Sequence, residues 1–152
     1  MKVKSMSWSP DKTLTYWINH ASRSLMKTFE QNLRPLGFGM AYMPVVIALD
    51  ESGELTQKEL AQKAGVEQPT MAVLLSRMER DGLIIRLPNP KDGRSHKIGL
   101  TDKARECLPA AKKKLYTIAA KASHHLSREE QDRLITVLQH MIKNLESETQ
   151  NL

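Results

Sequence analysis

The sequence predicts a protein that is mainly α with a small β wing, built as a winged helix-turn-helix lobe with a helix before it and helices after it. Residues 56–82 show two short helical patterns joined by a tight turn, the spacing of a helix-turn-helix. Residues 83–100 hold two short apolar runs around a polar, basic stretch, which predicts a hairpin wing. We therefore expect one domain, 1–152, with a lobe at 40–100 and terminal helices at 9–35 and 101–148.

Composition narrows the classes of function. A hydrophobic content of 40% and a charged content of 26% are typical of a soluble globular domain. The net charge of +6 makes a polyanion a plausible partner. Cys107 is the single cysteine, which excludes an intrachain disulfide and a cysteine-based zinc cluster. Because no apolar run resembles a leader or a membrane span, we expect a cytoplasmic protein.

The first helix is expected to begin at Ser9-Pro10-Asp11, with a hydroxyl N-cap, proline at the first helical position and an acid in the first turn. Pro35 and Gly37 should end it. A second helix is expected over Met40–Asp50, with Pro44 disturbing its first turns. Helical spacing of apolar residues supports the first of these helices, at Leu14, Trp17, Ile18, Ala21, Leu25, Phe29 and Leu33.

The helix-turn-helix follows. Thr56 and Glu59 form a T-x-x-E capping box, and Gly65 should close that helix. Pro69 lies near the start of the next helix, and Gly82 should end it. The spacing i, i+3, i+4, i+7 predicts that its buried face is Met71, Leu74, Leu75 and Met78.

The opposite face of this second helix fits the major groove of DNA. Polar side chains at its N-terminal end can reach base edges or a phosphate, small apolar side chains can touch thymine methyl groups, and an arginine can bind phosphate or guanine. A solvated surface helix would show the same pattern, so the neighbouring wing carries part of this interpretation. The expected contact residues are Gln68, Pro69, Thr70, Ala72, Val73, Ser76 and Arg77.

The strands are expected at Leu83–Leu87 and Lys97–Leu100, and the segment PNPKDGRSH between them should project as a wing. An arginine at a hairpin tip suits the negative potential of a narrow minor groove. Directly after a helix-turn-helix, this arrangement favours DNA over an ordinary exposed hairpin. The expected wing contacts are Lys91, Asp92, Arg94, His96 and Lys97.

The terminal helices predict a homodimer. A helix capped by Thr101-Asp102 carries a heptad seam, in which Pro109 should introduce a kink. A last helix, capped at Ser127, adds a further apolar stripe. Together with the first helix they present more apolar surface than a small lobe covers, which a twofold dimer would bury. The seam consists of Ala104, Leu108, Ala111, Leu115, Ile118 and Ala122; the last stripe consists of Leu134, Val137, Leu138, Met141 and Leu145.

Residues 55–101 resemble the MarR/SlyA family of winged-helix regulators, above all in the wing pattern Asp92-x-Arg94 followed by Leu100-Thr101. The resemblance implies a homodimer on a pseudo-palindromic operator in double-stranded DNA, most simply a repressor released by a small ligand. It also implies that Arg94 enters the minor groove while Asp92 helps to hold the wing. Val73, Ser76 and Gly93 depart from residues that are frequent in the family, so the resemblance does not imply which bases are read. Other matching positions are Leu60-Ala61, Gln68-Pro69-Thr70, Leu75, Arg77, Glu79 and Gly82-Leu83.

Two features of the sequence bear on how the protein is regulated: a group of aromatic and Met residues and the single cysteine. The resemblance places a small aromatic or anionic effector near Trp17, His20, Phe38, Tyr42 and Met43, although the same residues would also serve as plain core. A core position for Cys107 is favoured over an oxidant sensor.

Metal binding and catalysis have little support in the sequence. His124 and His125, taken as helical neighbours, should point about 100° apart and would need a third residue, such as His20 or His140, to bind metal. We expect no cofactor and no enzyme activity, since no catalytic constellation is visible. A redox- or metal-responsive regulator and a protein adaptor remain alternatives.

Overall fold

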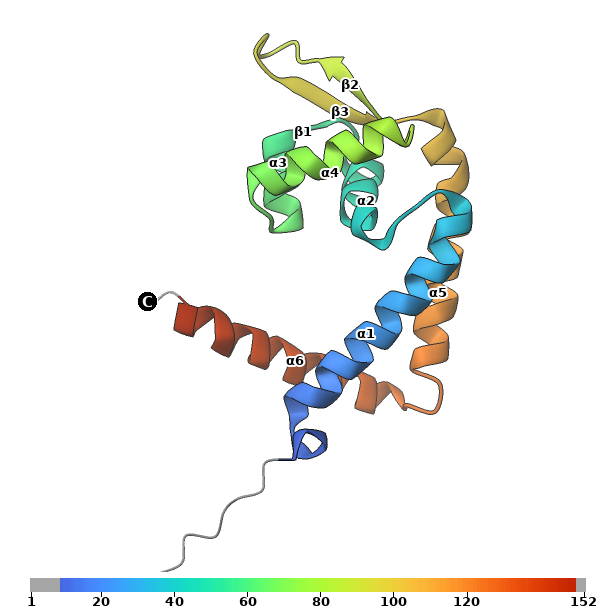
Figure 1. Ribbon diagram of the computed structural model, residues 1–152, viewed down its shortest axis with the longest axis vertical. Coiled ribbons are helices and arrows are strands. Elements are labelled where there is room, and N and C mark those ends of the chain that lie inside the picture. Colours follow the sequence, from blue (N-terminus) through green and yellow to red (C-terminus); the bar gives the residue numbers. More distant parts are fainter. Residues whose placement is uncertain (1–8, 150–152) are drawn as a thin grey trace, which may run out of the picture. The chain divides into compact units, whose positions relative to one another are not determined.

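The computed structural model describes residues 9–149 of the chain, which divides into two compact units, Met1–Leu115 and Tyr116–Leu152. The larger unit holds a lobe of short helices and strands together with the long helix α1 (Figure 1). Its elements are η1 Pro10–Lys12, α1 Leu14–Leu33, η2 Arg34–Leu36, η3 Met40–Tyr42, α2 Met43–Ser52, β1 Leu55–Thr56, α3 Gln57–Ala64, α4 Gln68–Arg80, β2 Ile84–Pro88, β3 His96–Leu100 and most of α5 Asp102–Ala122. The smaller unit holds the end of α5 and all of α6 Arg128–Thr149.

The start of the first helix differs from the prediction. Ser9 caps only the 3-10 turn η1, and α1 begins later, at Leu14. Thr13 has an extended backbone and its Oγ1 accepts the Tyr16 N–H at 3.3 Å, so Thr13 supplies the N-cap. The predicted cap at Ser9 was therefore wrong, because a second hydroxyl nearer the helical segment satisfies the free amide.

The second helix confirms the expected effect of its proline. Met40–Tyr42 forms a 3-10 turn and the α-helix begins only at Met43. Pro44 thus lies in the first turn of α2, where a missing N–H costs no helical hydrogen bond. This placement lets α2 bury an apolar face in the lobe, with Met43, Val45, Val46, Ala48 and Leu49 all buried.

The sheet is antiparallel with strand order β1-β3-β2. Strands β2 and β3 confirm the predicted hairpin, with Arg86 opposite Ile98 and Pro88 opposite His96. Strand β1 was not predicted: Leu55 pairs with Ile98 directly before α3 begins. Two residues are too short to show the alternation by which a strand is recognised in a sequence, so only pairing in space reveals it.

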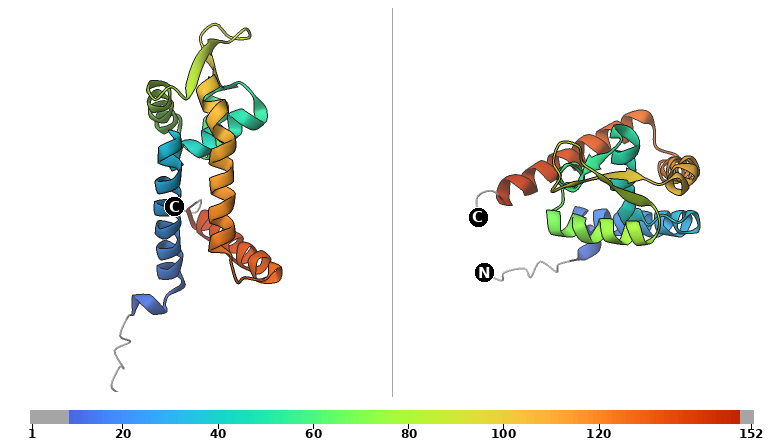
Figure 2. Two further views of the ribbon diagram at one scale, coloured as in Figure 1. Left: turned by 90° about the vertical axis from the view of Figure 1, so that its right-hand side faces the viewer. Right: turned by 90° about the horizontal axis from the view of Figure 1, so that it is seen from above.

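The core of the lobe lies where α4 packs against its neighbours. Met71, Leu75 and Met78 have no exposed surface and Leu74 is partly buried, as the helical spacing predicted. The left view of Figure 2 shows the wing hairpin at the end of the lobe. The same apolar cluster includes the predicted seam residues at the start of α5, namely Ala104, Leu108 and Ala111.

The C-terminal helices are capped as expected. Thr101 Oγ1 accepts the Ala104 N–H at 3.2 Å, and Ser127 Oγ accepts the Glu130 N–H at 3.2 Å. Pro109 lies inside α5, which is helical on both sides of it; whether it kinks the helix stays a prediction. Among residues 9–149, no helix is long and apolar enough to cross a membrane.

Candidate nucleic-acid interface

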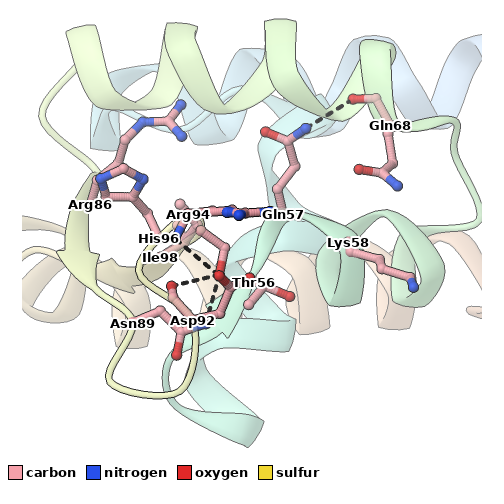
Figure 3. A pocket seen from close by; sticks show the side chains of 11 residues that line it. Thr56, Gln57, Lys58, Gln68, Arg86, Asn89, Asp92, Arg94, His96 and Ile98 are labelled. Carbon is pink, nitrogen blue, oxygen red and sulfur yellow. Dashed lines mark hydrogen bonds between the residues drawn. The ribbon is translucent and has the colours of Figure 1, made fainter.

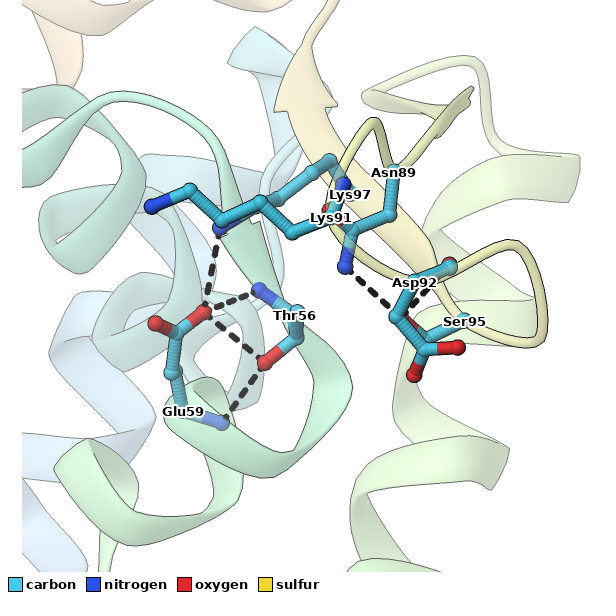
Figure 4. A network of polar contacts seen from close by, with 7 residues as sticks. All are labelled: Thr56, Glu59, Asn89, Lys91, Asp92, Ser95 and Lys97. Carbon is cyan, nitrogen blue, oxygen red and sulfur yellow. Dashed lines mark hydrogen bonds and ion pairs between the residues drawn. The ribbon is translucent and has the colours of Figure 1, made fainter.

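The first helix of the helix-turn-helix is tied to the wing strand by one carboxylate. Glu59 Oε2 accepts the Thr56 N–H at 2.6 Å and the Thr56 hydroxyl at 2.8 Å, while Thr56 Oγ1 accepts the Glu59 N–H at 3.3 Å (Figure 4). Lys97 of β3 reaches the same oxygen at 3.5 Å. The Thr56 amide and hydroxyl, followed by the Lys97 charge, lower the pKa of Glu59. The capping box is thus confirmed and also joins α3 to β3.

The turn between the two helices depends on one glycine. Gly65 has φ +64, in the left-handed region, and caps the C-terminus of α3. After two further residues α4 begins at Gln68, and Gln57 Nε2 donates to the Gln68 carbonyl at 3.5 Å. This geometry brings the N-terminal ends of α3 and α4 to one side of the lobe.

The outward face of α4 is open, as predicted. Val73 is 54% exposed, and Arg77 forms no ion pair within residues 9–149. Ser76 bonds to the Ala72 carbonyl at 3.0 Å, so its hydroxyl is already engaged by its own helix. The remaining predicted contacts at the start of the helix, Gln68, Pro69 and Thr70, are all exposed.

The wing presents cations with no carboxylate bound to them. Lys91 and Arg94 are exposed and form no ion pair in the part of the chain that the structure describes. Asp92 Oδ1 accepts the backbone N–H of Arg94 at 3.0 Å, an arrangement that shapes the tip of the loop. A cation without a protein partner is free to exchange its counterion for a phosphate.

Wing and helix-turn-helix enclose a polar cleft of about 450 Å³ (Figure 3). The predicted residues Gln68, Asp92, Arg94 and His96 lie in its wall. The wall also contains residues that were not predicted as contacts: Thr56, Gln57, Lys58, Arg86, Asn89 and Ser95. Asn89 and Ser95 belong to the predicted wing segment and Thr56 to the predicted capping box, but no periodic signal marks any of the six as a contact.

Strand register decides which wing side chains face this cleft. Side chains alternate along a strand, so Arg86 and His96 share one face of the hairpin, while Lys97 lies on the other. Arg86 Nε also donates to Glu79 Oε2 of α4 at 3.1 Å. The ammonium group of Lys97 pairs with Glu59, and its side chain is 23% exposed. A contact between Lys97 and DNA stays a prediction.

The residues expected around an effector do not meet within one chain. Phe38 and Met43 are each 1% exposed and belong to the core, and the Tyr42 hydroxyl donates to Asp81 Oδ2 at 2.7 Å. Trp17 is 55% exposed, and its ring and that of His20 lie edge to face at 6.1 Å.

The position of η3 explains this separation. Glu30 Oε2 accepts the Met40 N–H at 2.9 Å, which places η3 beside Glu30. The rise of an α-helix then puts Trp17 about 20 Å further along α1. A pocket shared by all five residues stays a prediction.

The structure corrects the placement of two histidines. His124 and His125 follow the end of α5, where His125 has φ +75, so they occupy a turn and not a helix. Their rings lie 4.0 Å apart, edge to face. Within residues 9–149, no group of three potential metal ligands comes together. Cys107 is partly buried against the core, the position favoured from the sequence.

Residues 43–96, which span α2, the helix-turn-helix and the hairpin, match the model of the MarR family. In this segment the chain is similar to the MarR family. Two curated relatives are transcriptional regulators: YdgJ of Bacillus subtilis (strain 168), uncharacterised, is 27% identical over 72% of this chain and 66% of its own length. The repressor IacR of Pseudomonas putida is 23% identical over 87% of this chain and 79% of its own length. The chain thus spans slightly less than two thirds of the first of these relatives.

Solved structures that share this fold include the transcriptional repressor CouR. In its complex with a 23-mer DNA duplex, CouR is 28% identical to this chain, with a TM-score of 0.78 and coverage of 93% of this chain and 99% of CouR. A second CouR structure, bound to p-coumaroyl-CoA, is 26% identical with a TM-score of 0.77, covering 93% and 98%. The likeness extends over the terminal helices as well as the lobe.

Proposed function

We propose that this chain is a transcriptional repressor of the MarR family that acts as a homodimer on a pseudo-palindromic operator in double-stranded DNA. The observation that carries the proposal is the cleft between the helix-turn-helix and the wing, with the unpaired cation Arg94 in its wall. In this arrangement α4 lies in the major groove and Arg94 enters the neighbouring minor groove. The CouR complex with duplex DNA supports the same use of the same fold.

We propose that a dimer places two DNA-binding lobes on one operator. Helix α6 exposes a row of apolar side chains, each between 41% and 63% exposed: Leu134, Ile135, Val137, Ile142 and Leu145. A second copy of the chain would cover this row and present two α4 helices to two half-sites, about one helical turn apart. The 23-mer bound by CouR is about two turns long, which accommodates two half-sites with flanking minor grooves.

The regulating ligand is proposed to be a small aromatic or anionic molecule, since CouR binds an aromatic acyl thioester, p-coumaroyl-CoA. Because Trp17 and His20 lie on the exposed end of α1, they meet such a ligand only if a partner subunit closes the site. The protein acts without a catalytic step, and we place it in the cytoplasm because its proposed target is the operator DNA.

The decisive experiment is selection of bound duplexes from a random DNA pool, followed by titration of the selected operator at fixed salt. Wild-type protein should select a pseudo-palindrome with A/T-rich flanks, and Arg94→Ala should lose affinity mainly at those flanks. Arg128→Ala is the matched control, because it removes the same charge from an exposed position in α6, outside the candidate interface. No selected sequence, or equal effects of the two variants, would contradict the proposal; salt-insensitive binding to a protein would favour the adaptor alternative.

A further inference from the structure

We propose that the hydrogen bond between Asn89 and Ser95 is the positioning element that holds Arg94 in its DNA-reading place before DNA arrives. This inference rests on the proposed function and adds two residues to it. Neither residue was predicted to contact DNA. Asn89 and Ser95 lie at the base of the wing loop, one on each arm, and face each other (Figure 4). Their contact joins Asn89 Nδ2 to Ser95 Oγ at 2.7 Å.

The first observation is that the wing loop is weakly packed. All five residues between the two, Pro90–Arg94, are exposed. A Cβ added at Gly93 would meet nothing within 4 Å. An exposed loop with no apolar contacts samples many conformations unless hydrogen bonds restrict it. The position of the Arg94 side chain must therefore depend on polar contacts inside the loop.

The second observation is that these contacts converge on Asn89 and Ser95. Asn89 Oδ1 accepts the Lys91 N–H at 3.1 Å, and the Asn89 carbonyl accepts the Asp92 N–H at 3.2 Å. On the other arm, the Ser95 N–H donates to the Asp92 carbonyl at 3.1 Å. With the Asn89–Ser95 bond, the loop closes as a ring that contains Asp92, the residue whose carboxylate holds the Arg94 amide.

The third observation concerns the position of this hydrogen-bonded loop. Asn89, Asp92, Arg94 and Ser95 all line the cleft beside α4, so a loop that opened would move Arg94 away from the DNA-facing side. Asn89 and Ser95 are only partly exposed, in contrast to the residues between them, which matches a bracing role at the base. The wing loop is thus ordered during folding, so DNA binding does not have to supply the conformational entropy cost of ordering it.

The contribution of this hydrogen bond to DNA affinity can be measured. A single hydrogen bond of this type contributes a net factor of about 2 to 10 in an equilibrium constant. Ser95→Ala and Asn89→Ala should therefore weaken operator binding by about that factor. The loss should appear in discrimination between A/T and G/C flanks, because it acts through Arg94. The dependence of affinity on salt should remain that of wild type, because no phosphate contact is removed.

The test is a double-mutant cycle with the selected operator: wild type, Ser95→Ala, Arg94→Ala and both changes together, with Ser52→Ala as control. Ser52 is an exposed serine at the end of α2, away from the cleft. If Ser95 acts through Arg94, Ser95→Ala weakens the wild-type protein and has no effect once Arg94 is alanine. Hydrogen exchange of the Arg94 amide in the free protein gives an independent measurement, and Asn89→Ala should speed it more than it speeds the exchange of amides in the core.

Several results would overturn the inference. Full affinity of Ser95→Ala would do so, and an equal loss in the Arg94→Ala background would show that Ser95 contacts DNA by itself. Unchanged exchange of the Arg94 amide in Asn89→Ala would show that the loop keeps its shape without the bond. A wild-type protein that binds no duplex would instead remove the proposed function. The exchange measurement would still report on the brace.

Discussion

The capping box at the start of α3 permits one prediction to be worked through from the contacts. Thr56→Ala removes the hydroxyl that accepts the Glu59 N–H and donates to Glu59 Oε2. Loss of an N-cap side chain costs about 1 kcal/mol of stability. For a chain of this length, that loss should lower the melting temperature by about 2 to 4 °C. Thr56→Ser keeps the hydroxyl and should melt close to wild type.

Calorimetry or circular dichroism at pH 7 measures both variants, and equal melting of Thr56→Ala and Thr56→Ser would refute the reasoning. The pH dependence gives a second check. Thr56 lowers the pKa of Glu59 from its usual 4.5, so the carboxylate contributes stability above about pH 4.5, and this is lost as the pH falls through the folded-state value. Glu59→Gln should therefore be destabilising at pH 7, and its deficit should shrink below pH 4.5. A deficit that stays constant with pH would contradict the assignment to this charge.

Three further predictions concern the core, a strained turn and the dimer. Met71→Ala empties a site with no exposed surface and should cost about 2 to 5 kcal/mol in a urea titration, where a loss below 1 kcal/mol would contradict the core assignment. His125→Gly relieves a positive φ and should raise the melting temperature slightly, and a lowered value would show that the imidazole makes a stabilising contact. Ile142→Ser on α6, 54% exposed in the single chain, should weaken the dimer by at least tenfold in sedimentation equilibrium, and an unchanged dimer would place the interface elsewhere.

Local chemistry explains the features that were predicted correctly. The T-x-x-E box, the glycine at position 65 and the serine at position 127 each act through hydrogen bonds or backbone freedom within a few residues, so their pattern predicts their geometry. The buried face of α4 followed from helical spacing for the same reason. The start of α1 was misplaced because two hydroxyls, at Ser9 and Thr13, compete for one helix end.

Features that depend on neighbours distant in the chain could not be predicted in this way. Strand β1 exists only because β3 lies beside it. Lys97 carries the charge expected of a DNA contact, but the register of the hairpin turns it toward Glu59, 38 residues earlier. Arg86, which has no motif around it, is brought to the cleft by that same register and by Glu79.

By itself, the sequence determined the class of the protein: helix-turn-helix, basic wing and apolar terminal helices all follow from contacts between residues close in the chain. Only the tertiary structure decided which cations are free to meet a polyanion and which are held by a carboxylate. The physical reason is that charge and exposure are different properties. Lys97 and Arg94 have the same charge and differ only in their surroundings. Lys97 forms an ion pair that links β3 to α3, whereas Arg94 is an exposed side chain at the wing tip.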